Sequence, residues 1–415
     1  MIGFDAPVMM RIKWLQELFL CSCYFEHSTV QAELFSKLKR TNDNGELRSI
    51  SLYDIYVNQE TLAELNNLLI CANTKIDDLV LQCSNGDGVM GALADGIVKC
   101  TELKRLSTSL STNVGWQPLS DTLVTPGSFL CDLDLRSSEI HYGDGAVFAR
   151  GIANNTSLKR LDLSSLAVME DEDMMAVMTS LPSNKSLEHL ELNDIDSISD
   201  DMVQSFANGL VEQETKLRIL SMDSCSSVSA AGWASLSAIL QNHHSRLHSM
   251  HLSSNNINDD VVGTFVDVLR DNGNSALHTL DIQDPSGPLT NDGWDRIGNL
   301  LCDPSSVNST RSSNHVLCNL GSYLWPDPPN TSDMEVVSMP HNVEELLKTN
   351  EINDKRAIAR KKVIDTHFSG AQNKIPLIDK QKLLPALLSW AGKDDLGYST
   401  VYHIIRKEPS LLNLN

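Results

Sequence analysis

The sequence predicts an α/β fold in which strand–helix repeats stack side by side into a solenoid. One observation is the pattern Leu-x-x-Leu-x-Leu, with aliphatic replacements, which recurs from residue 47 at a mean period of about 29 residues. The other is a pair of apolar residues, four apart, shortly before most copies. Alternation places side chains on one face of a strand, and a spacing of four places them on one face of a helix. Each unit is therefore expected to contain a strand, a loop, a helix and a return loop.

The copies of the strand pattern define the extent of the repeats. They begin at Leu47, Ile76, Leu103, Leu130, Leu158, Leu187, Leu217, Leu247 and Leu277, and a weaker copy begins at Leu317. The copy at Leu103 is degraded, because Thr108 occupies its sixth position. A single unit cannot cover its own apolar face, so neighbouring units must stack. We therefore expect a repeat domain over residues 47–322, with about nine or ten repeats.

Helix starts are indicated by a polar residue seven positions before each apolar helix pair. Its occupants in successive repeats are Glu170, Ser199, Ser229, Asn258 and Thr290. Most of these side chains can accept a hydrogen bond from the free N–H groups of a helix. Acidic residues follow in most of the first turns, where negative charge meets the positive end of the helix dipole.

The stretch Gly86–Gly91 matches G-x-G-x-x-G, the fingerprint of dinucleotide-binding enzymes. In the repeat register, however, its first glycine occupies the helix-start position of the copy that begins at Ile76. The following "LADGI" at 93–97 matches "FARGI" at 148–152 and "FANGL" at 206–210. The pattern therefore favours a strand-to-helix turn over a nucleotide site, and we expect no cofactor.

These repeats resemble the ribonuclease-inhibitor class of leucine-rich repeats. The resemblance rests on stretches such as "GALADGIVKCTELKRL" and "FARGIANNTSLKRLDLSSL", and it covers about residues 47–285. It implies a curved, right-handed horseshoe, with a parallel sheet on the concave face and helices outside. The ninth repeat position of that class is usually Asn or Cys, as at Cys225 and Asn255. Other residues stand there at Ile55, Leu166, Ile195 and Pro285, which puts the regularity of the loops in question.

The two ends of the chain depart from the repeat. Residues 1–46 have helical character, with Trp14, Leu15, Leu18, Phe19, Leu34 and Leu38 as apolar positions, and we expect an N-terminal helical cap. Three prolines in "WPDPPNTSD" predict a linker over 323–341. Residues 342–415 are expected to form a C-terminal helical segment, whose first helix spans 342–368. Its basic residues allow two interpretations, a solvated cap or an autoinhibitory arm that lies against the acidic repeats.

The charge balance limits the classes of partner. The chain carries 54 acidic and 33 basic residues, a formal net charge of −21. Such acidity repels nucleic acid and anionic lipids and favours a partner protein with a basic patch. No apolar run is long enough for a membrane span. The nine scattered cysteines favour reduced thiols, so we expect a cytoplasmic protein, with the nucleus as an alternative.

The third, fifth and seventh positions of each strand copy point away from the core onto the concave face. The residues expected to bind a partner there are Asp78, Asp132, Asp134, Arg136, Arg160, Asp162, His189, Glu191, Asp223, His251 and Asp281. Asp134, Asp162 and Glu191 occupy the same position of three successive repeats, where like charges would repel one another. We interpret them as an acidic stripe that attracts a basic partner. The alternative is that they only keep an exposed sheet soluble.

Motifs for chemistry are missing from the sequence. There is no P-loop and no G-x-S-x-G, and the histidines near residue 248 fall on different elements, so we expect neither an enzyme nor a metal site. The predicted function is that of a monomeric scaffold that binds another protein and no small-molecule substrate. The alternatives are a regulator of an enzyme, as a GTPase activator of the Ran type or a ribonuclease-inhibitor-like inhibitor, and a passive assembly subunit.

Overall fold

The structure is a computed structural model of the full chain. It describes residues 16–21, 28–41, 46–71, 74–83, 86–110, 115–168, 170–242, 244–271, 276–284, 289–321, 339–367, 402 and 406. The chain divides into two compact units, Met1–Asn255 and Asn256–Asn415. This division falls inside the segment 47–322, which the sequence predicted to be one repeat domain.

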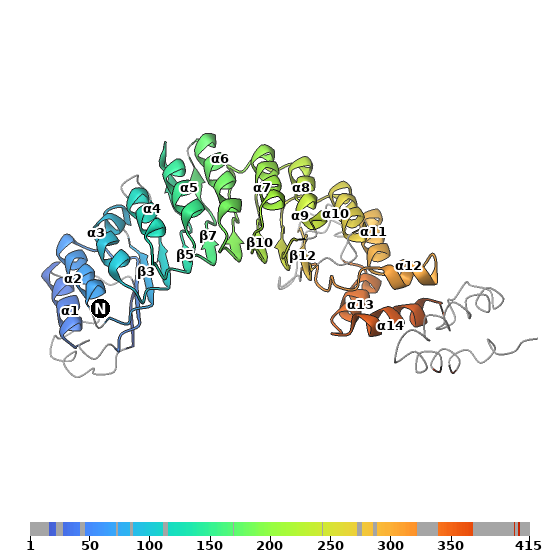
Figure 1. The fold of residues 1–415 in the computed structure, drawn as a ribbon, viewed down its shortest axis with the longest axis horizontal. Helices are drawn as coiled ribbons and strands as arrows, with labels where there is room; N and C mark the ends of the chain where they lie inside the picture. The colour runs from blue at the N-terminus through green and yellow to red at the C-terminus, as the bar shows by residue number, and fades with distance from the viewer. Residues whose placement is uncertain are drawn as a thin grey trace, which may run out of the picture. The chain divides into compact units, whose positions relative to one another are not determined.

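Strands and helices alternate along the first unit (Figure 1). Its main strands are β1 (Glu17–Cys21), β2 (Ser49–Tyr53), β3 (Asp78–Gln82), β4 (Arg105–Thr108), β5 (Asp132–Asp134), β7 (Arg160–Asp162), β9 (His189–Glu191), β10 (Ile219–Ser221) and β11 (Ser249–His251). Its helices are α1 (Ser28–Thr41), α2 (Gln59–Ile70), α3 (Gly86–Lys99), α4 (Trp116–Val124), α5 (Asp144–Asn154), α6 (Asp171–Ser180), α7 (Asp200–Glu212), α8 (Ala230–Ser235) and α9 (Ser237–Gln241). The short strands β6 (Glu139–Ile140) and β8 (Ala167–Val168) pair with each other in the strand-to-helix loops.

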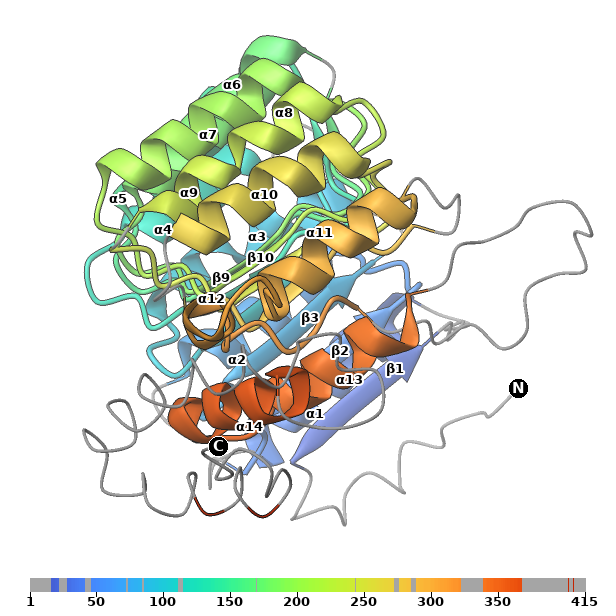
Figure 2. The ribbon, with the colours of Figure 1, turned by 90° about the vertical axis from the view of Figure 1, so that its right-hand side faces the viewer.

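The main strands of the first unit form one parallel sheet in chain order. Leu133 pairs with Leu161, Leu161 with Leu190, and Leu190 with Leu220, so the repeated leucines occupy adjacent strands in the same register. Their side chains are buried between the sheet and the helices, which lie together on one side of it (Figures 1 and 2). The predicted α/β architecture of alternating strands and helices is therefore confirmed, in a form consistent with a leucine-rich-repeat solenoid.

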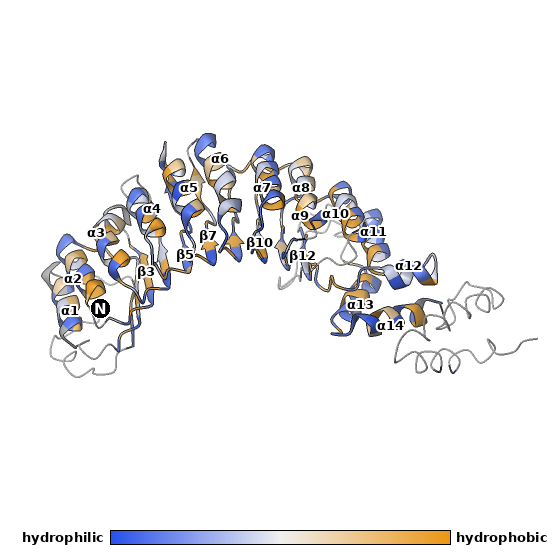
Figure 3. Cartoon of the chain, viewed as in Figure 1, coloured by the Kyte–Doolittle hydropathy of each residue, from blue (hydrophilic) through white to orange (hydrophobic). Residues whose placement is uncertain are grey.

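The helices carry one apolar side and one polar side, as the hydropathy colouring makes visible (Figure 3). In α2, for example, Leu65 and Leu69 are fully buried, whereas Ala63 is exposed. The same holds for Phe148 and Ile152 in α5. The spacing of four that predicted the helices thus marks the side that packs against the sheet.

A repeated backbone turn follows the strands. The eighth repeat position adopts a left-handed conformation at Asp54, Ser137, Ser165, Asp194, Ser224 and Ser254, with φ between 49° and 57°. The turn directs the backbone N–H of Ser137 to the carbonyl of Ser164, and that of Ser165 to the carbonyl of Asn193. Left-handed turns at residues other than glycine are uncommon, but short polar residues tolerate them. The strand exits at Ser137 and Ser165 are thereby bonded to the next repeat.

Buried asparagines fasten the return loops. Asn184 accepts hydrogen bonds from the backbone N–H groups of Ser186 and Leu187, and its Nδ2 donates to the carbonyl of Ile152 at 2.9 Å. Asn155 acts in the same way one repeat earlier, with Nδ2 donating to Leu123 at 2.8 Å. Hydrogen bonds of this kind satisfy backbone groups that burial would otherwise leave unpaired.

Where Cys and Asn occupy the ninth repeat position, their side chains bond to backbone groups of the loops. Asn255 Oδ1 accepts from the backbone N–H of Cys225, and its Nδ2 donates to the carbonyl of Met222. Cys225 Sγ lies 3.2 Å from the carbonyl oxygen of Leu192. Ser138, which the sequence did not single out, acts similarly by accepting from the N–H of Leu110.

The helix starts follow the expected pattern in part. Ser229, Asn258 and Thr290 accept hydrogen bonds from N–H groups of the first helical turn, whereas the side chains of Glu170 and Ser199 do not. The G-x-G-x-x-G stretch, Gly86–Gly91, forms the first turns of α3, which begins at Gly86, the helix-start position given by the repeat register.

The N-terminal segment differs from the expected helical cap. Glu17–Cys21, where a helix was expected, is the strand β1, which pairs in parallel with β2. Leu18 and Leu20 are buried while Phe19 is exposed, which is the alternation of a strand with one covered face. The helix α1 (Ser28–Thr41) then follows, and Trp14 and Leu15 lie outside the described residues.

The second unit continues the alternation and then ends in helices. It contains α10 (Asp259–Asp271), β12 (Thr279–Asp281), α11 (Asn291–Leu301), α12 (Val307–Ser312), α13 (His341–Asn350) and α14 (Lys355–His367). Thr279 pairs in parallel with Asn319, so the weak copy at Leu317 adds a further strand-like segment. Most of the expected linker 323–341 and nearly all of 368–415 lie outside the described residues.

Two helices, α13 and α14, replace the single helix expected over 342–368, because the helical conformation is interrupted at 351–354. They pack on α11 and α12, respectively. Lys362, one of the basic residues of α14, is buried and donates from Nζ to the carbonyls of Leu301 and Asn314. The contacts of this helix favour its interpretation as a cap on the last repeat segments of the second unit.

Candidate functional site: the open face of the sheet

The face of the sheet opposite the helices carries the side chains at the third, fifth and seventh repeat positions. The register aligns them in rows across neighbouring strands. In the third-position row, Asp78, Arg105, Asp132, Arg160 and His189 follow one another on β3, β4, β5, β7 and β9. Acidic and basic residues alternate from Asp78 to Arg160, so Arg105 lies between two aspartates, and Arg160 lies between Asp132 and His189.

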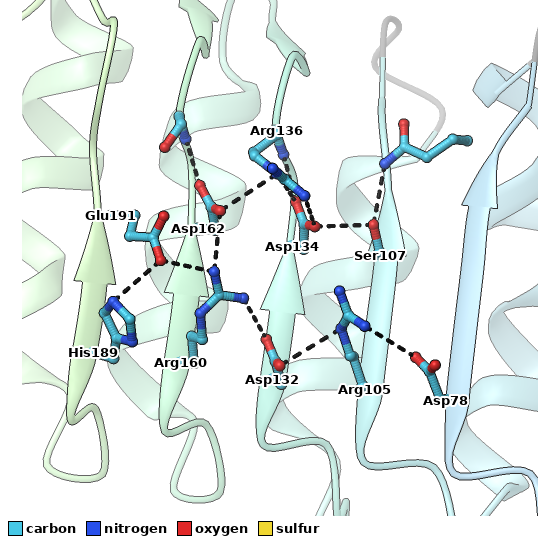
Figure 4. A network of polar contacts seen from close by, with 12 residues as sticks. Asp78, Arg105, Ser107, Asp132, Asp134, Arg136, Arg160, Asp162, His189 and Glu191 are labelled. Atoms are coloured by element: carbon cyan, nitrogen blue, oxygen red, sulfur yellow. Dashed lines mark hydrogen bonds and ion pairs between the residues drawn. The ribbon is translucent and has the colours of Figure 1, made fainter. Parts of the chain in front are cut away.

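Arg160 makes three ion pairs with neighbouring carboxylates (Figure 4). Its Nη1 lies 3.2 Å from Asp132 Oδ1, and its Nη2 lies 2.7 Å from Glu191 Oε1 and 3.3 Å from Asp162 Oδ2. Arg105 makes longer ion pairs, 3.7 Å from Asp78 and 3.6 Å from Asp132. Arg160 is therefore held by short contacts on three sides, and Arg105 is held more loosely.

A further arginine, Arg136, contacts two carboxylates of the fifth-position row. Arg136 donates from Nε and Nη2 to the two oxygens of Asp134, at 3.1 and 2.9 Å. Its Nε also lies 3.4 Å from Asp162 Oδ2. Ser107 donates to Asp134 Oδ2 at 3.1 Å, and the backbone N–H of Ser164 donates to Asp162 Oδ1 at 3.0 Å. Both carboxylates are thus hydrogen-bonded on more than one side.

The pKa values in this network are pushed in different directions. Burial raises the pKa of Asp134, but the hydrogen bonds and charge of Arg136 outweigh it, so the pKa lies below its ordinary value. Burial, together with the charges of Glu191 and Asp134, raises the pKa of Asp162 despite its bonds from Ser164. The hydrogen bond from His189, helped by Arg160, lowers the pKa of Glu191 to about 2.

This network corrects the expectation that Asp134, Asp162 and Glu191 form an exposed row of repelling charges. The side chains of Asp134 and Asp162 are each only 1% exposed, and those of Arg136 and Arg105 are 57% and 40% exposed. Each carboxylate of the row has a cationic partner within 3.4 Å. The acids therefore take part in holding the sheet together, and arginines form the outer layer above them.

The other residues predicted to bind a partner lie apart from this network. Asp223 follows β10 and accepts a hydrogen bond from the N–H of Ser253, which ties it to the next repeat. His251 lies on β11 in the same unit. Asp281 lies on β12 in the second unit, where its Oδ1 accepts from the N–H of Gln283.

Two features of this side of the first unit were not predicted. Phe19 on β1 is 65% exposed, and its ring lies 5.5 Å from that of Tyr53 on β2, which forms an aromatic pair on the open face. The strand-to-helix loops also carry exposed acids, among them Glu170, Asp194 and Asp196. Asp194 and Asp196 each accept from a serine of a neighbouring repeat, Ser165 and Ser226.

Other kinds of site would need a group that can bind a metal ion or a helix that can cross a membrane. Among the described residues, no group of three or more His, Cys, Asp or Glu is placed to hold a metal ion. Within the same part of the chain, none of the helices has the length and apolar character needed to cross a bilayer.

Comparison with known proteins gives a weak similarity to a leucine-rich-repeat protein. No family model matches the chain. A stretch of 98 residues, 24% of this chain, is 33% identical to the "NACHT, LRR and PYD domains-containing protein 3" of Mus musculus and 34% identical to that of Rattus norvegicus. The matched stretch spans 9% of each of those proteins. The similarity supports a leucine-rich-repeat character for this chain and suggests a role in protein interaction.

Proposed function

We propose that this chain is a scaffold that binds another protein through the open face of its parallel sheet. The observation that carries the proposal is that one face of the sheet of the first unit is covered by helices (Figure 1), while the other presents an ordered polar network (Figure 4) and the aromatic pair of Phe19 and Tyr53. Ordered side chains on an extended, rigid surface lose little entropy when a partner binds. The repeat length and motifs also lead us to propose a curved solenoid of the ribonuclease-inhibitor class.

The charge distribution supports a partner that carries a basic patch. The exposed acids Glu170, Asp194 and Asp196 lie on strand-to-helix loops at the edge of the open face, where a basic surface would gain association rate and selectivity. The same acidity disfavours nucleic acid and anionic membranes. We further propose that the chain is no enzyme, needs neither cofactor nor metal, and acts as a monomer in the cytoplasm or nucleus.

A pair of matched variants tests the open face. Ser51 on β2 is a small residue of the open face, and Ala63 on α2 is exposed on the helix side of the same repeat. Ser51→Arg and Ala63→Arg therefore add the same side chain to opposite sides of one unit. We expect proteins captured from cell extract by the wild-type chain to be captured by Ala63→Arg and lost with Ser51→Arg.

The capture experiment is read by quantitative mass spectrometry, and circular dichroism verifies that both variants fold. If Ser51→Arg captured the same proteins as Ala63→Arg, the open face would not be the binding surface. If the wild-type chain captured nothing above an unrelated protein of similar charge, the scaffold proposal would be wrong.

A further inference from the structure

The two most exposed side chains of this network are guanidinium groups, Arg136 at 57% and Arg105 at 40%, although the sequence of this region is dominated by acids. Arg136 is the most exposed member of the network, and Asp134 and Asp162 beneath it are hidden from solvent. A molecule that approaches Arg136 therefore meets its hydrogen-bond donors before the two buried carboxylates. This order of layers matters for the kind of group that can bind there, because guanidinium donates and never accepts.

The contacts of Arg136 leave some of its N–H donors unused. Its Nε and Nη2 are occupied by Asp134 and Asp162, whereas its Nη1 has no hydrogen-bond partner among the described residues. The fork with Asp134 fixes the guanidinium plane, so binding a further group would immobilise little. Carboxylate is the protein group that best matches guanidinium in charge and geometry.

An aromatic contact lies in the same row of the sheet. Tyr53 pairs across the strands with Gln82, whose Nε2 donates to Ser107, and Ser107 donates in turn to Asp134. Tyr53 and Arg136 are both at the seventh repeat position, on β2 and directly after β5. Three strand spacings separate them, about 14 Å at about 4.8 Å per strand. An extended segment covers that span in about four residues, since each residue rises about 3.3 Å.

We propose that the open face binds a segment of a partner protein that carries a carboxylate for Arg136 and, about four residues away, an apolar side chain for the Phe19–Tyr53 pair. This inference rests on the proposed function and specifies what the partner presents to the middle of the face. The basic patch of the partner would contact the acidic loops at the edge of the sheet. Arg136 thus acts as a binding residue, and Asp134 positions it.

The probe for this proposal is a display library of random linear peptides, selected against the full chain. We expect the enriched peptides to share an Asp or Glu and an apolar or aromatic residue about four positions apart. The selected peptide is then measured against Arg136→Gln, Arg136→Lys and Phe19→Ser. A matched control is Arg150→Gln, because Arg150 is exposed on α5, away from the open face.

We expect Arg136→Gln to weaken peptide binding about tenfold or more and Arg136→Lys to weaken it less, while Arg150→Gln leaves the affinity unchanged. Because Arg136→Gln leaves a buried carboxylate, Asp134→Asn/Arg136→Gln provides a second variant without that charge. Replacing the acidic residue of the peptide by its amide should weaken binding to the wild type but cause no further loss with the double variant.

Three results would overturn the proposal: enriched peptides without acidic residues, no enrichment above an unrelated protein, or an affinity that does not depend on Arg136. Each leaves the scaffold proposal standing, provided that Ser51→Arg still abolishes protein capture. If neither Ser51→Arg nor Ala63→Arg reduced protein capture, the result would instead count against the proposed function itself.

Discussion

Arg136 and Asp134, two residues apart at the end of β5, form a fork in which both carboxylate oxygens accept from one guanidinium, at 3.1 and 2.9 Å. Asp134 is buried and Arg136 is not. The pair is therefore unequal, because the carboxylate depends on the arginine much more than the arginine depends on the carboxylate.

Removing the arginine should cost more stability than removing both partners. Arg136→Gln leaves the Asp134 carboxylate buried with few partners, and we expect the free energy of unfolding to fall by about 3 kcal/mol. The double variant Asp134→Asn/Arg136→Gln should lose clearly less, since no buried charge remains. Urea unfolding followed by circular dichroism measures both. Equal losses for the single and double variants would contradict this account.

Glu191 should make the protein sensitive to acid. Its pKa is about 2 in the folded chain, below the ordinary value of 4.5, so the unfolded state binds the proton more readily over that interval. Stability should fall as the pH decreases from 4.5 towards 2, by up to about 1.4 kcal/mol per pH unit from this group. Glu191→Gln should have a shallower acid limb in thermal unfolding, and the same slope as the wild type above about pH 6. An unchanged acid limb would show that the pairing with Arg160 and His189 is weak in solution.

Lys362 should affect stability on the alkaline side of the pH range. Burial lowers its pKa from 10.5 to about 7, so above pH 7 the folded chain releases a proton that the unfolded chain keeps. This group should raise stability between about pH 7 and 10, by up to about 1.4 kcal/mol per pH unit. Lys362→Met removes the titrating group and should flatten that rise in thermal unfolding. A rise of equal slope in the variant would assign it to other groups.

Two glycines should respond in opposite ways to alanine. A Cβ on Gly145 would lie 2.5 Å from the backbone oxygen of Asp173, so Gly145→Ala should force α5 away from α6 and cost about 2 kcal/mol. Gly88 is exposed in α3, and among the described residues the nearest atom to its added Cβ would be 4.0 Å away. Gly88→Ala should stabilise the chain by about 0.5–1 kcal/mol. A large loss at Gly88 in urea unfolding would revive the question of a special role for the G-x-G-x-x-G stretch.

The repeat architecture could be predicted because burial leaves a trace in the spacing of apolar residues. Leu79 and Leu81 alternate within β3, and Leu65 and Leu69 are one helical turn apart in α2, so strands and helices could be told apart without structural data. The strand β1 was missed because Leu15, Leu18 and Phe19 also fit a helical spacing. Its pairing with β2 decides the conformation, and that contact lies outside the reach of a local pattern.

The alignment of the predicted residues in rows on the open face could be derived from the repeat register, but their electrostatics were misjudged. A count of charges treats Asp134 and Asp162 as an acidic stripe, whereas the structure places Arg136 and Arg160 against them. The signal was present, since residues two apart on a strand share a face, and Asp134 precedes Arg136 by two positions as Arg160 precedes Asp162. The left-handed turns after the strands left no comparable signal, because Ser and Asp occupy them in place of glycine.

Three buried asparagine amides donate backwards along the chain. Asn155 donates to Leu123, Asn184 to Ile152, and Asn350 to Leu317, each to a carbonyl of the preceding repeat or segment. A chain leaves the ribosome amino end first, so every such acceptor has already been synthesised when its donor appears. Shortening the array from the carboxyl side leaves each remaining amide with its acceptor, whereas shortening it from the amino side strips the acceptor from the first one left. For these amides, removing repeats from the carboxyl side is therefore less disruptive than removing them from the amino side.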